Sequence, residues 1–188
     1  MFSKNLSLFQ ACPVIAAAKD QKHLKISLAS PCEVVFLLGG EVATIAELVD
    51  EAKAGGKFVV VHIDLISGLS NKESAVDFIK KYTAADGIIS TRPQTIKHAN
   101  ALGLFTVLRV FLLDSMALDN LEKQVDSSKP DMIEVLPGLM PRIIEKICSM
   151  TTVPLIAGGL ISEKSDVVSA LSAGATCIST TKPELWYI

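Results

Sequence analysis

The feature that most constrains the fold is a repeat in which a short apolar stretch precedes a helix-like segment that ends near Ala or Gly. Glycine readily adopts the left-handed conformation that ends a helix, as we expect at Ala101-Leu102-Gly103. Strands and helices that alternate, with strands rich in Val, Ile and Leu, indicate a parallel sheet covered on both faces. We expect the strands at Pro13–Ala18, Glu33–Leu38, Lys57–Asp64, Gly87–Ser90, Phe105–Phe111, Asp131–Leu136, Pro154–Ala157 and Thr176–Thr180.

Eight such units favour a closed barrel over an open, doubly wound sheet. The 188 residues can bury a proper core, but they are few for a barrel of this type. We therefore expect an α/β fold, a compact TIM-like (β/α)8 barrel with short helices. No linker or change of composition divides the chain, so residues 1–188 are expected to form one domain.

Composition and charge limit the possible functions. The net charge is −2 and no run of Lys or Arg is present, so charge alone marks no surface for nucleic acid. Residues 1–10 are too polar for a signal peptide, and no apolar stretch reaches the roughly 18 residues of a membrane span. We expect a cytoplasmic protein that does not contact the membrane.

The cysteines and known motifs suggest no cofactor. Cys12, Cys32, Cys148 and Cys177 have no C-x-x-C spacing, so we expect reduced and mostly buried thiols. No H-E-x-x-H, P-loop or G-x-S-x-G motif and no clustered metal-ligand spacing occurs. We therefore assign no catalytic residue, metal site or cofactor.

A glycine pair near the C-terminus suggests an anion site. The strand that begins at Pro154 runs into Gly158-Gly159, where the backbone can approach a ligand closely. A helix starting around Leu160–Ser162 would direct its free N–H groups to the same point. The last strand ends in hydroxyl groups, and paired ends of the last two barrel strands commonly hold phosphate. The alternative is a turn that merely reverses the chain. The predicted phosphate site comprises Gly158, Gly159, Ser179, Thr180 and Thr181.

Polar residues recur at the ends of the expected strands. In Phe58–Asp64 the apolar residues alternate so that His62 and Asp64 share the inward face. Glu134 alternates with apolar neighbours in the same way, and Arg109 is in phase with Phe105. Each residue of this set would lie near the mouth of the barrel, where barrels place their ligand sites. The predicted pocket comprises Lys19, His62, Asp64, Ser90, Thr91, Arg109 and Glu134.

Two alternatives to a ligand pocket stay open for individual residues. Two cations and two anions in one cavity can neutralise one another, so the set would also be explained as an internal ion-pair network. His62 by itself is more typical of a hydrogen-bonded core histidine than of a catalyst. Arg92 precedes Pro93 at the entry to a helix, where it would neutralise a phosphate or remain a solvated surface arginine.

Five ordered motifs resemble those of the glycerol-uptake-operon antiterminator family. The resemblance runs from about Gln10 to Trp186, although Leu108 replaces a family Gln and the Gly39-Gly40-Glu41 loop departs from the family pattern. It implies a TIM-like barrel and a cytosolic bacterial regulator that responds to glycerol 3-phosphate. Such a regulator acts on the leader mRNA of its target, the glycerol-utilisation genes, to prevent premature termination of transcription. The motifs are Val61–Leu69, Gly87–Arg92, Arg109–Ser115, Ile133–Gly138 and Ile156–Ile161.

Two other functions remain as alternatives. One is a barrel enzyme, of lyase or isomerase type, that acts on a small phosphorylated substrate with Lys19 or Asp64 as base and Glu134 as acid. The other is an interaction module in which the polar strand ends are purely structural. The apolar terminus at 185–188 needs cover, either from the barrel or from a second subunit, so a homo-oligomer is possible.

Overall fold

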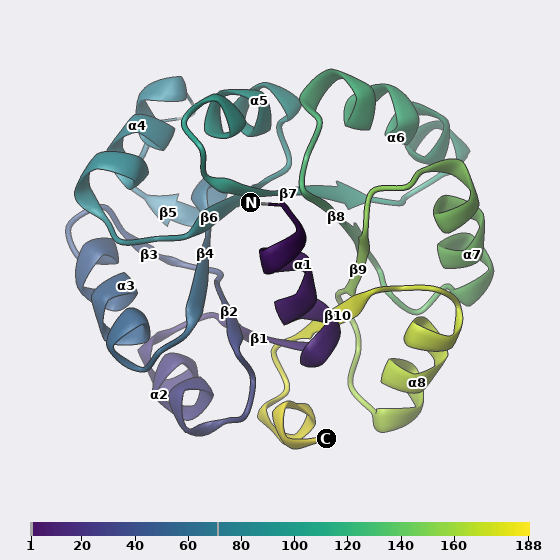
Figure 1. Cartoon of the computed structure of the whole chain (residues 1–188), viewed down its shortest axis with the longest axis horizontal. Helices are drawn as coiled ribbons and strands as arrows, with labels where there is room; N and C mark the ends of the chain where they lie inside the picture. The colour runs from purple at the N-terminus through teal and green to yellow at the C-terminus, as the bar shows by residue number, and fades with distance from the viewer. Residues whose placement is uncertain (1, 71) are drawn as a thin grey trace.

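The computed structural model describes residues 2–70 and 72–188. Within them, eight parallel strands close into a barrel in the order β1-β10-β9-β8-β7-β6-β4-β2, and helices surround it (Figure 1). The predicted TIM-like barrel is confirmed. The barrel strands are β1 (Val14–Ala18), β2 (Val34–Leu37), β4 (Phe58–His62), β6 (Gly87–Ser90), β7 (Phe105–Phe111), β8 (Met132–Leu136), β9 (Leu155–Gly158) and β10 (Cys177–Thr180).

The helices that connect the strands are short, as expected. α5 ends at Ala101, and Gly103 follows with a φ of 70°, the left-handed conformation predicted for it. One predicted strand was too long: β4 ends at His62 because the chain turns there into the 3-10 helix η1 (Ile63–Leu65). The connecting helices are α2 (Gln21–Ala29), α3 (Ile45–Ala54), α4 (Glu73–Tyr82), α5 (Pro93–Ala101), α6 (Ser115–Ser128), α7 (Pro141–Met150) and α8 (Lys164–Ser172).

The strands alternate their side chains between two apolar layers. Val59 and Val61 belong to the larger layer, which packs beneath the surrounding helices. Val60 belongs to the smaller layer inside the barrel, together with Ile15 and Val107. This period of two confirms the predicted strand faces, because His62 is in phase with Val60 along β4.

The N-terminal end of the barrel is covered by a helix that the sequence analysis did not predict. α1 (Phe2–Ala11) lies across the opening (Figure 1). Its Phe9 is fully buried, stacks on Phe105 at 5.2 Å between ring centroids and meets the edge of Phe58 at 5.9 Å. These aromatic side chains fill the N-terminal end of the barrel, so open space for a ligand remains at the carboxyl ends of the strands.

Two small elements complete the fold. β3 (Gly40–Glu41) pairs with β5 (Ile66–Ser67) and joins the loops that follow β2 and β4. After β10 the 3-10 helix η2 (Pro183–Tyr187) packs against β1 and α2. Trp186 is buried there, and its Nε1 donates to the Thr180 carbonyl at 2.9 Å. The barrel itself thus covers part of the apolar terminus. No helix in the described part of the chain is long and apolar enough to cross a membrane.

Candidate functional site

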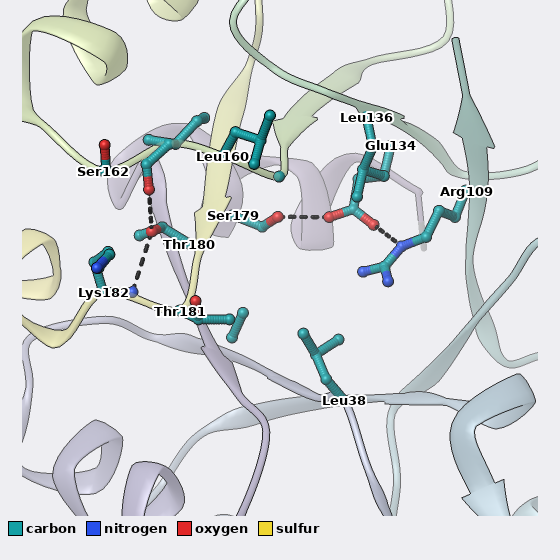
Figure 2. A pocket seen from close by; sticks show the side chains of 13 residues that line it. Leu38, Arg109, Glu134, Leu136, Leu160, Ser162, Ser179, Thr180, Thr181 and Lys182 are labelled. Carbon is teal, nitrogen blue, oxygen red and sulfur yellow. Dashed lines mark hydrogen bonds and ion pairs between the residues drawn. The ribbon is translucent and has the colours of Figure 1, made fainter. Parts of the chain in front are cut away.

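A cavity of about 530 Å³ opens at the carboxyl ends of the strands (Figure 2). The floor holds a charged pair, one wall is apolar, and the rim is formed by the loops that follow β9 and β10. It is lined by Ala17, Leu38, Arg109, Glu134, Leu136, Gly159, Leu160, Ile161, Ser162, Ser179, Thr180, Thr181 and Lys182. Six of the predicted site residues are therefore among the lining, and they come from four strands or the loops that follow them.

Glu134 anchors the floor of this cavity. The residue is fully buried on β8, opposite Arg109 in the register with β7. Arg109 Nε lies 2.6 Å from Glu134 Oε2, and Ser179 Oγ donates to Glu134 Oε1 at 2.5 Å. A side chain at Gly158 would have its Cβ 2.6 Å from that Oε1. Gly158 is thus needed beneath the carboxylate, even though it does not line the cavity.

Arg109 keeps donors for a ligand. Its guanidinium uses Nε for Glu134, whereas the two terminal nitrogens extend toward the cavity in Figure 2. The side chain is only 8% exposed. Because Glu134 neutralises its charge, Arg109 can remain buried and still offer N–H groups to oxygen atoms of a bound molecule.

The turn after β9 has an unusual backbone. Gly159 has a φ of 74°, and Leu160, which follows it, has a φ of 61° although it is not a glycine. Leucine rarely adopts this left-handed conformation, which costs free energy and is found mostly where function requires it. The Leu160 side chain is 72% exposed at the rim of the cavity. The turn therefore combines backbone strain with an apolar side chain left in solvent.

The predicted start of the next helix at Leu160–Ser162 is wrong. α8 begins at Lys164, and Asp166 Oδ2 accepts the amides of Ser162 and Glu163 at 2.9 Å each. The Glu163 side chain completes a capping box with Asp166. These amide hydrogen bonds hold the pKa of the Asp166 carboxyl below its usual value. The amides of Ser162 and Glu163, which directly precede α8, are therefore already bound by a carboxylate and are not available to an anion.

The hydroxyl groups after β10 divide into a structural one and an accessible one. Thr180 is buried, donates to the Ile161 carbonyl at 2.8 Å and accepts the Lys182 amide at 3.2 Å. Thr181 and Lys182 are exposed at the rim. Thr180 thus ties the two loops together, while Thr181 and Lys182 can contact a ligand. The sequence analysis missed Lys182, which directly follows the predicted hydroxyl residues.

A second polar cluster forms above β4 and β6. Asp64 accepts hydrogen bonds from Ser90 Oγ at 2.9 Å, from the Thr91 amide at 2.7 Å and from Thr91 Oγ1 at 2.9 Å. Both Thr91 bonds go to Asp64 Oδ2, whereas Arg92 Nη2 pairs at 2.5 Å with Oδ1, the oxygen that also accepts Ser90. Burial by itself would raise the pKa of Asp64, but the bonds from Arg92, Thr91 and Ser90 outweigh it and hold this pKa below its usual value. None of the four residues lines the cavity.

His62 and Lys19 do not line the cavity. His62 is 2% exposed, and its Nδ1 has no hydrogen-bond partner among the described residues. Burial, aided by the Arg109 charge, lowers its pKa to about 4, so the ring is neutral at pH 7. Lys19 is exposed beside a separate hollow that also borders Gly39 and Gly40. The expectation of one pocket for all the strand-end charges is therefore wrong, because their loops carry them in different directions.

Comparisons with known proteins agree with this geometry. Residues 14–186 match the family described as glycerol-3-phosphate responsive antiterminators. The chain is 42% identical to the uncharacterized protein YgcP of Escherichia coli K12, over 96% of this chain and 95% of YgcP.

Two solved structures are also similar. A glycerol uptake operon antiterminator regulatory protein from Listeria monocytogenes has 36% identity and a TM-score of 0.89, over 92% of this chain and 94% of that one. An antiterminator-related protein from Thermotoga maritima has 33% identity and a TM-score of 0.82, over 92% and 96%. The family match spans most of the barrel, as the resemblance of the motifs predicted. The chain belongs to the family of glycerol-3-phosphate responsive antiterminators.

Proposed function

We propose that the protein senses glycerol 3-phosphate and, when it is bound, acts on the leader mRNA of glycerol-utilisation genes to prevent premature termination of transcription. The observation that carries the proposal is the cavity at the ends of β9 and β10, in a chain of this family. It joins a cationic, hydroxyl-bearing rim to a buried Arg109–Glu134 pair. Such a division suits a small molecule with a phosphate at one end and hydroxyl groups at the other.

In this proposal the phosphate binds at the rim. Lys182 supplies a positive charge, Thr181 supplies a hydroxyl donor, and the Gly159 turn lets the backbone come close. Gly159 and Thr181 keep their predicted role in binding phosphate. Gly158, Ser179 and Thr180 support the site from below, through the Glu134 carboxylate and the loop carbonyl of Ile161.

The glycerol part then lies on the floor. The terminal nitrogens of Arg109 donate to its hydroxyl oxygens, while the Glu134 carboxylate holds Arg109 in place. Leu38 and Leu136 contact its carbon atoms from the apolar wall. The Arg109–Glu134 pair thus recognises hydroxyl groups. Because the two charges of the pair neutralise each other, Lys182 is the residue that balances the charge of the phosphate.

Regulation requires that the ligand favour one conformation. A ligand shifts a conformational equilibrium only through its different affinity for the two states. The Gly159-Leu160 turn is the element we expect to respond, because it lines the cavity, carries left-handed strain and exposes Leu160 at the surface. RNA would bind the favoured state in the cytoplasm, through phosphate contacts and single-stranded bases.

A melting-temperature screen tests the ligand. We expect glycerol 3-phosphate to raise the melting temperature more than glycerol or inorganic phosphate does, with about 2.7 kcal/mol of stabilisation at a hundred times its Kd. The Lys182→Ala variant should lose most of the shift, while Lys19→Ala, an exposed strand-end lysine outside the cavity, should keep it. A shift no larger than that from phosphate would contradict the proposed effector.

Leader-RNA binding with and without glycerol 3-phosphate tests the gating. We expect tighter binding with the ligand in the wild-type protein and no ligand effect in Lys182→Ala. RNA affinity that does not respond to the ligand would remove the gating mechanism but leave the sensor intact. Sedimentation of the protein with and without ligand would show whether a homo-oligomer forms.

A barrel enzyme is the rival function, and the site argues against it. Asp64 is committed to Ser90, Thr91 and Arg92, and its lowered pKa makes it a poor general base. Both Glu134 oxygens accept hydrogen bonds from protein groups. Incubation with glycerol 3-phosphate and related triose phosphates should therefore give no product. Turnover that Asp64→Asn abolishes would support the enzyme instead.

A further inference from the structure

Four large apolar side chains remain in solvent where β7 and β8 end. Leu113 is 85% exposed and Met116 is 68% exposed, and Phe111 and Leu139 are exposed as well. The first three lie between the end of β7 and the first turn of α6, and Leu139 lies in the loop after β8, the strand that pairs with β7. The four side chains thus come from neighbouring loops, and we call them the apolar patch. Apolar side chains that gather on a surface mark a site of interaction with a partner.

The loop that carries Leu113 is held firmly. On one side of Leu113, the amide of Leu112 donates to the Leu136 carbonyl at 2.8 Å. On the other side, the Asp114 side chain accepts the Ala117 amide at 2.9 Å and caps α6. Leu113 therefore projects from a backbone that is already ordered. A partner that buries this side chain has little conformational entropy to remove from the loop.

The helices beside the patch leave a seam between them. α6 is next to α7 in the ring around the barrel (Figure 1), but α6 packs on α5 and α7 packs on α8, and within the described part of the chain α6 and α7 barely touch each other. A hollow of about 470 Å³ opens at the start of α7, where Met140, Pro141 and Ile143 give it apolar walls. Arg142 and Lys146 complete its lining. One chain thus offers both a projecting leucine and a hollow that can receive a leucine.

Charges of opposite sign flank this α6–α7 seam. α6 carries Asp119, Glu122 and Asp126 against one Lys, whereas α7 carries Arg142 and Lys146 against one Glu. Asp119 and Arg142 are exposed, and neither takes part in an ion pair among the described residues. RNA does not suit this surface, because its phosphates would meet the acidic side chains of α6. A second copy suits it, since a two-fold axis sets α6 of each copy against α7 of the other.

We propose that two copies of the chain dock through the apolar patch and the α6–α7 seam to form a symmetric homodimer. Leu113 of each copy enters the α7 hollow of the other copy and is removed from water. Asp119 of each copy lies opposite Arg142 of the other, so both halves of the interface join opposite charges. Because the same surface serves both copies, the contact closes at two and does not extend into a filament.

This interface is separate from the proposed ligand site. Leu113, Asp119 and Arg142 are not among the residues that line the cavity. The dimer therefore requires neither glycerol 3-phosphate nor RNA. A failure of the dimer proposal would leave the proposed function untouched, and the reverse is also true.

Sedimentation velocity of the full chain at increasing concentration tests the dimer. We expect the wild-type protein to sediment at twice the mass of the chain, and Leu113→Glu, which places a charge in the apolar hollow, to sediment as a monomer. Val168→Glu is the matched control and should remain a dimer, because Val168 is also exposed but lies on α8, outside the patch. A monomeric wild type, or a dimer that persists in Leu113→Glu, would overturn the proposal.

An exchange of charges tests the two-fold arrangement without altering the apolar patch. Arg142→Glu and Asp119→Lys each set like charges opposite one another, so each variant alone should dimerise at least about tenfold more weakly. An equimolar mixture should recover the wild-type affinity, because both charge pairs are again of opposite sign in the mixed dimer. A mixture that binds no more tightly than the single variants would refute the two-fold pairing. A monomeric protein whose leader-RNA binding is weakened by Leu113→Glu would assign this surface to RNA instead.

Discussion

Two polar clusters at the same end of the barrel differ in the hydrogen-bond donors that they leave available to a ligand. Around Asp64, the donors of Ser90, Thr91 and Arg92 converge on one carboxylate, and none of these residues lines the cavity. Around Glu134, the carboxylate is also satisfied, but its partner Arg109 still directs terminal N–H groups into open space.

The difference shows that a strand-end charge is not sufficient evidence of a ligand site. Both carboxylates come from residues that alternate with apolar neighbours, so their strand patterns look alike. The Asp64 cluster joins β4 to β6 and is closed. The Glu134 cluster is open, because Arg109 has more donors than Glu134 can accept from it.

The largest effect is expected from removal of the Glu134 carboxylate. Glu134→Ala leaves Arg109 buried without its partner and should cost about 3–5 kcal/mol of unfolding free energy, measured by urea denaturation. The double variant Arg109→Met with Glu134→Leu should recover much of this loss, because no charge is then left unpaired. A double variant as unstable as Glu134→Ala would show that the pair itself, and not the orphaned charge, determines stability.

His62 lies between the two clusters and should make the unfolding free energy depend on pH. Its folded pKa of about 4 lies below its ordinary value of 6.5, so the unfolded chain binds the proton first as the pH falls. The unfolding free energy should fall between pH 6.5 and pH 4 by up to about 1.4 kcal/mol per pH unit. His62→Gln should flatten this part of the curve in urea titrations. Parallel curves for the two proteins would contradict the lowered pKa.

Asp64→Asn should affect stability without affecting the ligand. We expect a loss of about 1–3 kcal/mol at pH 7, because the amide cannot accept all the bonds from Thr91 and Arg92. Since the Asp64 pKa is lowered in the folded state, its contribution is full above the unfolded pKa and disappears as the pH falls through the folded value. The gap between wild type and variant should therefore close in strong acid. A large loss of glycerol 3-phosphate affinity in Asp64→Asn would show that the Asp64 cluster also serves ligand binding, and would contradict the difference between the two clusters.

Thr181→Val should produce the smallest effect, confined to ligand binding. The substitution keeps the shape of the exposed side chain but removes its hydroxyl from the rim. We expect about 1 kcal/mol of lost binding free energy, or about fivefold in Kd by calorimetry, with the melting temperature of the free protein unchanged. The matched change Thr91→Val, in the closed cluster, should leave Kd unchanged and lower stability instead.

The order of the barrel strands and the faces of their residues follow from local pattern. Alternation of apolar residues places Glu134, Arg109 and His62 inside, because side chains of a strand point to opposite faces in turn. The family could likewise be predicted from five motifs, and the match over residues 14–186 confirms it.

Loops and termini were less predictable. The polar sequence of α1 does not predict a helix that covers the barrel. Its Phe9 is buried only because the fold places it beside Phe58 and Phe105. The start of α8 was misplaced because the side-chain cap at Asp166 takes the amides that the glycine turn would otherwise offer. Hydrogen bonds of this kind depend on which groups a loop brings together, and residue order does not specify that.

By itself, the sequence determined the barrel, the inward direction of the strand-end residues and the position of the glycine turn at the end of β9. Only the tertiary structure decided that Arg109, Glu134 and Ser179 share a cavity with Thr181 and Lys182 while Asp64 joins Arg92 elsewhere. The physical reason is the distance along the chain over which each effect acts. Strand faces obey a two-residue period set by the local backbone, whereas the partner of a buried charge depends on which strands the closed barrel places side by side.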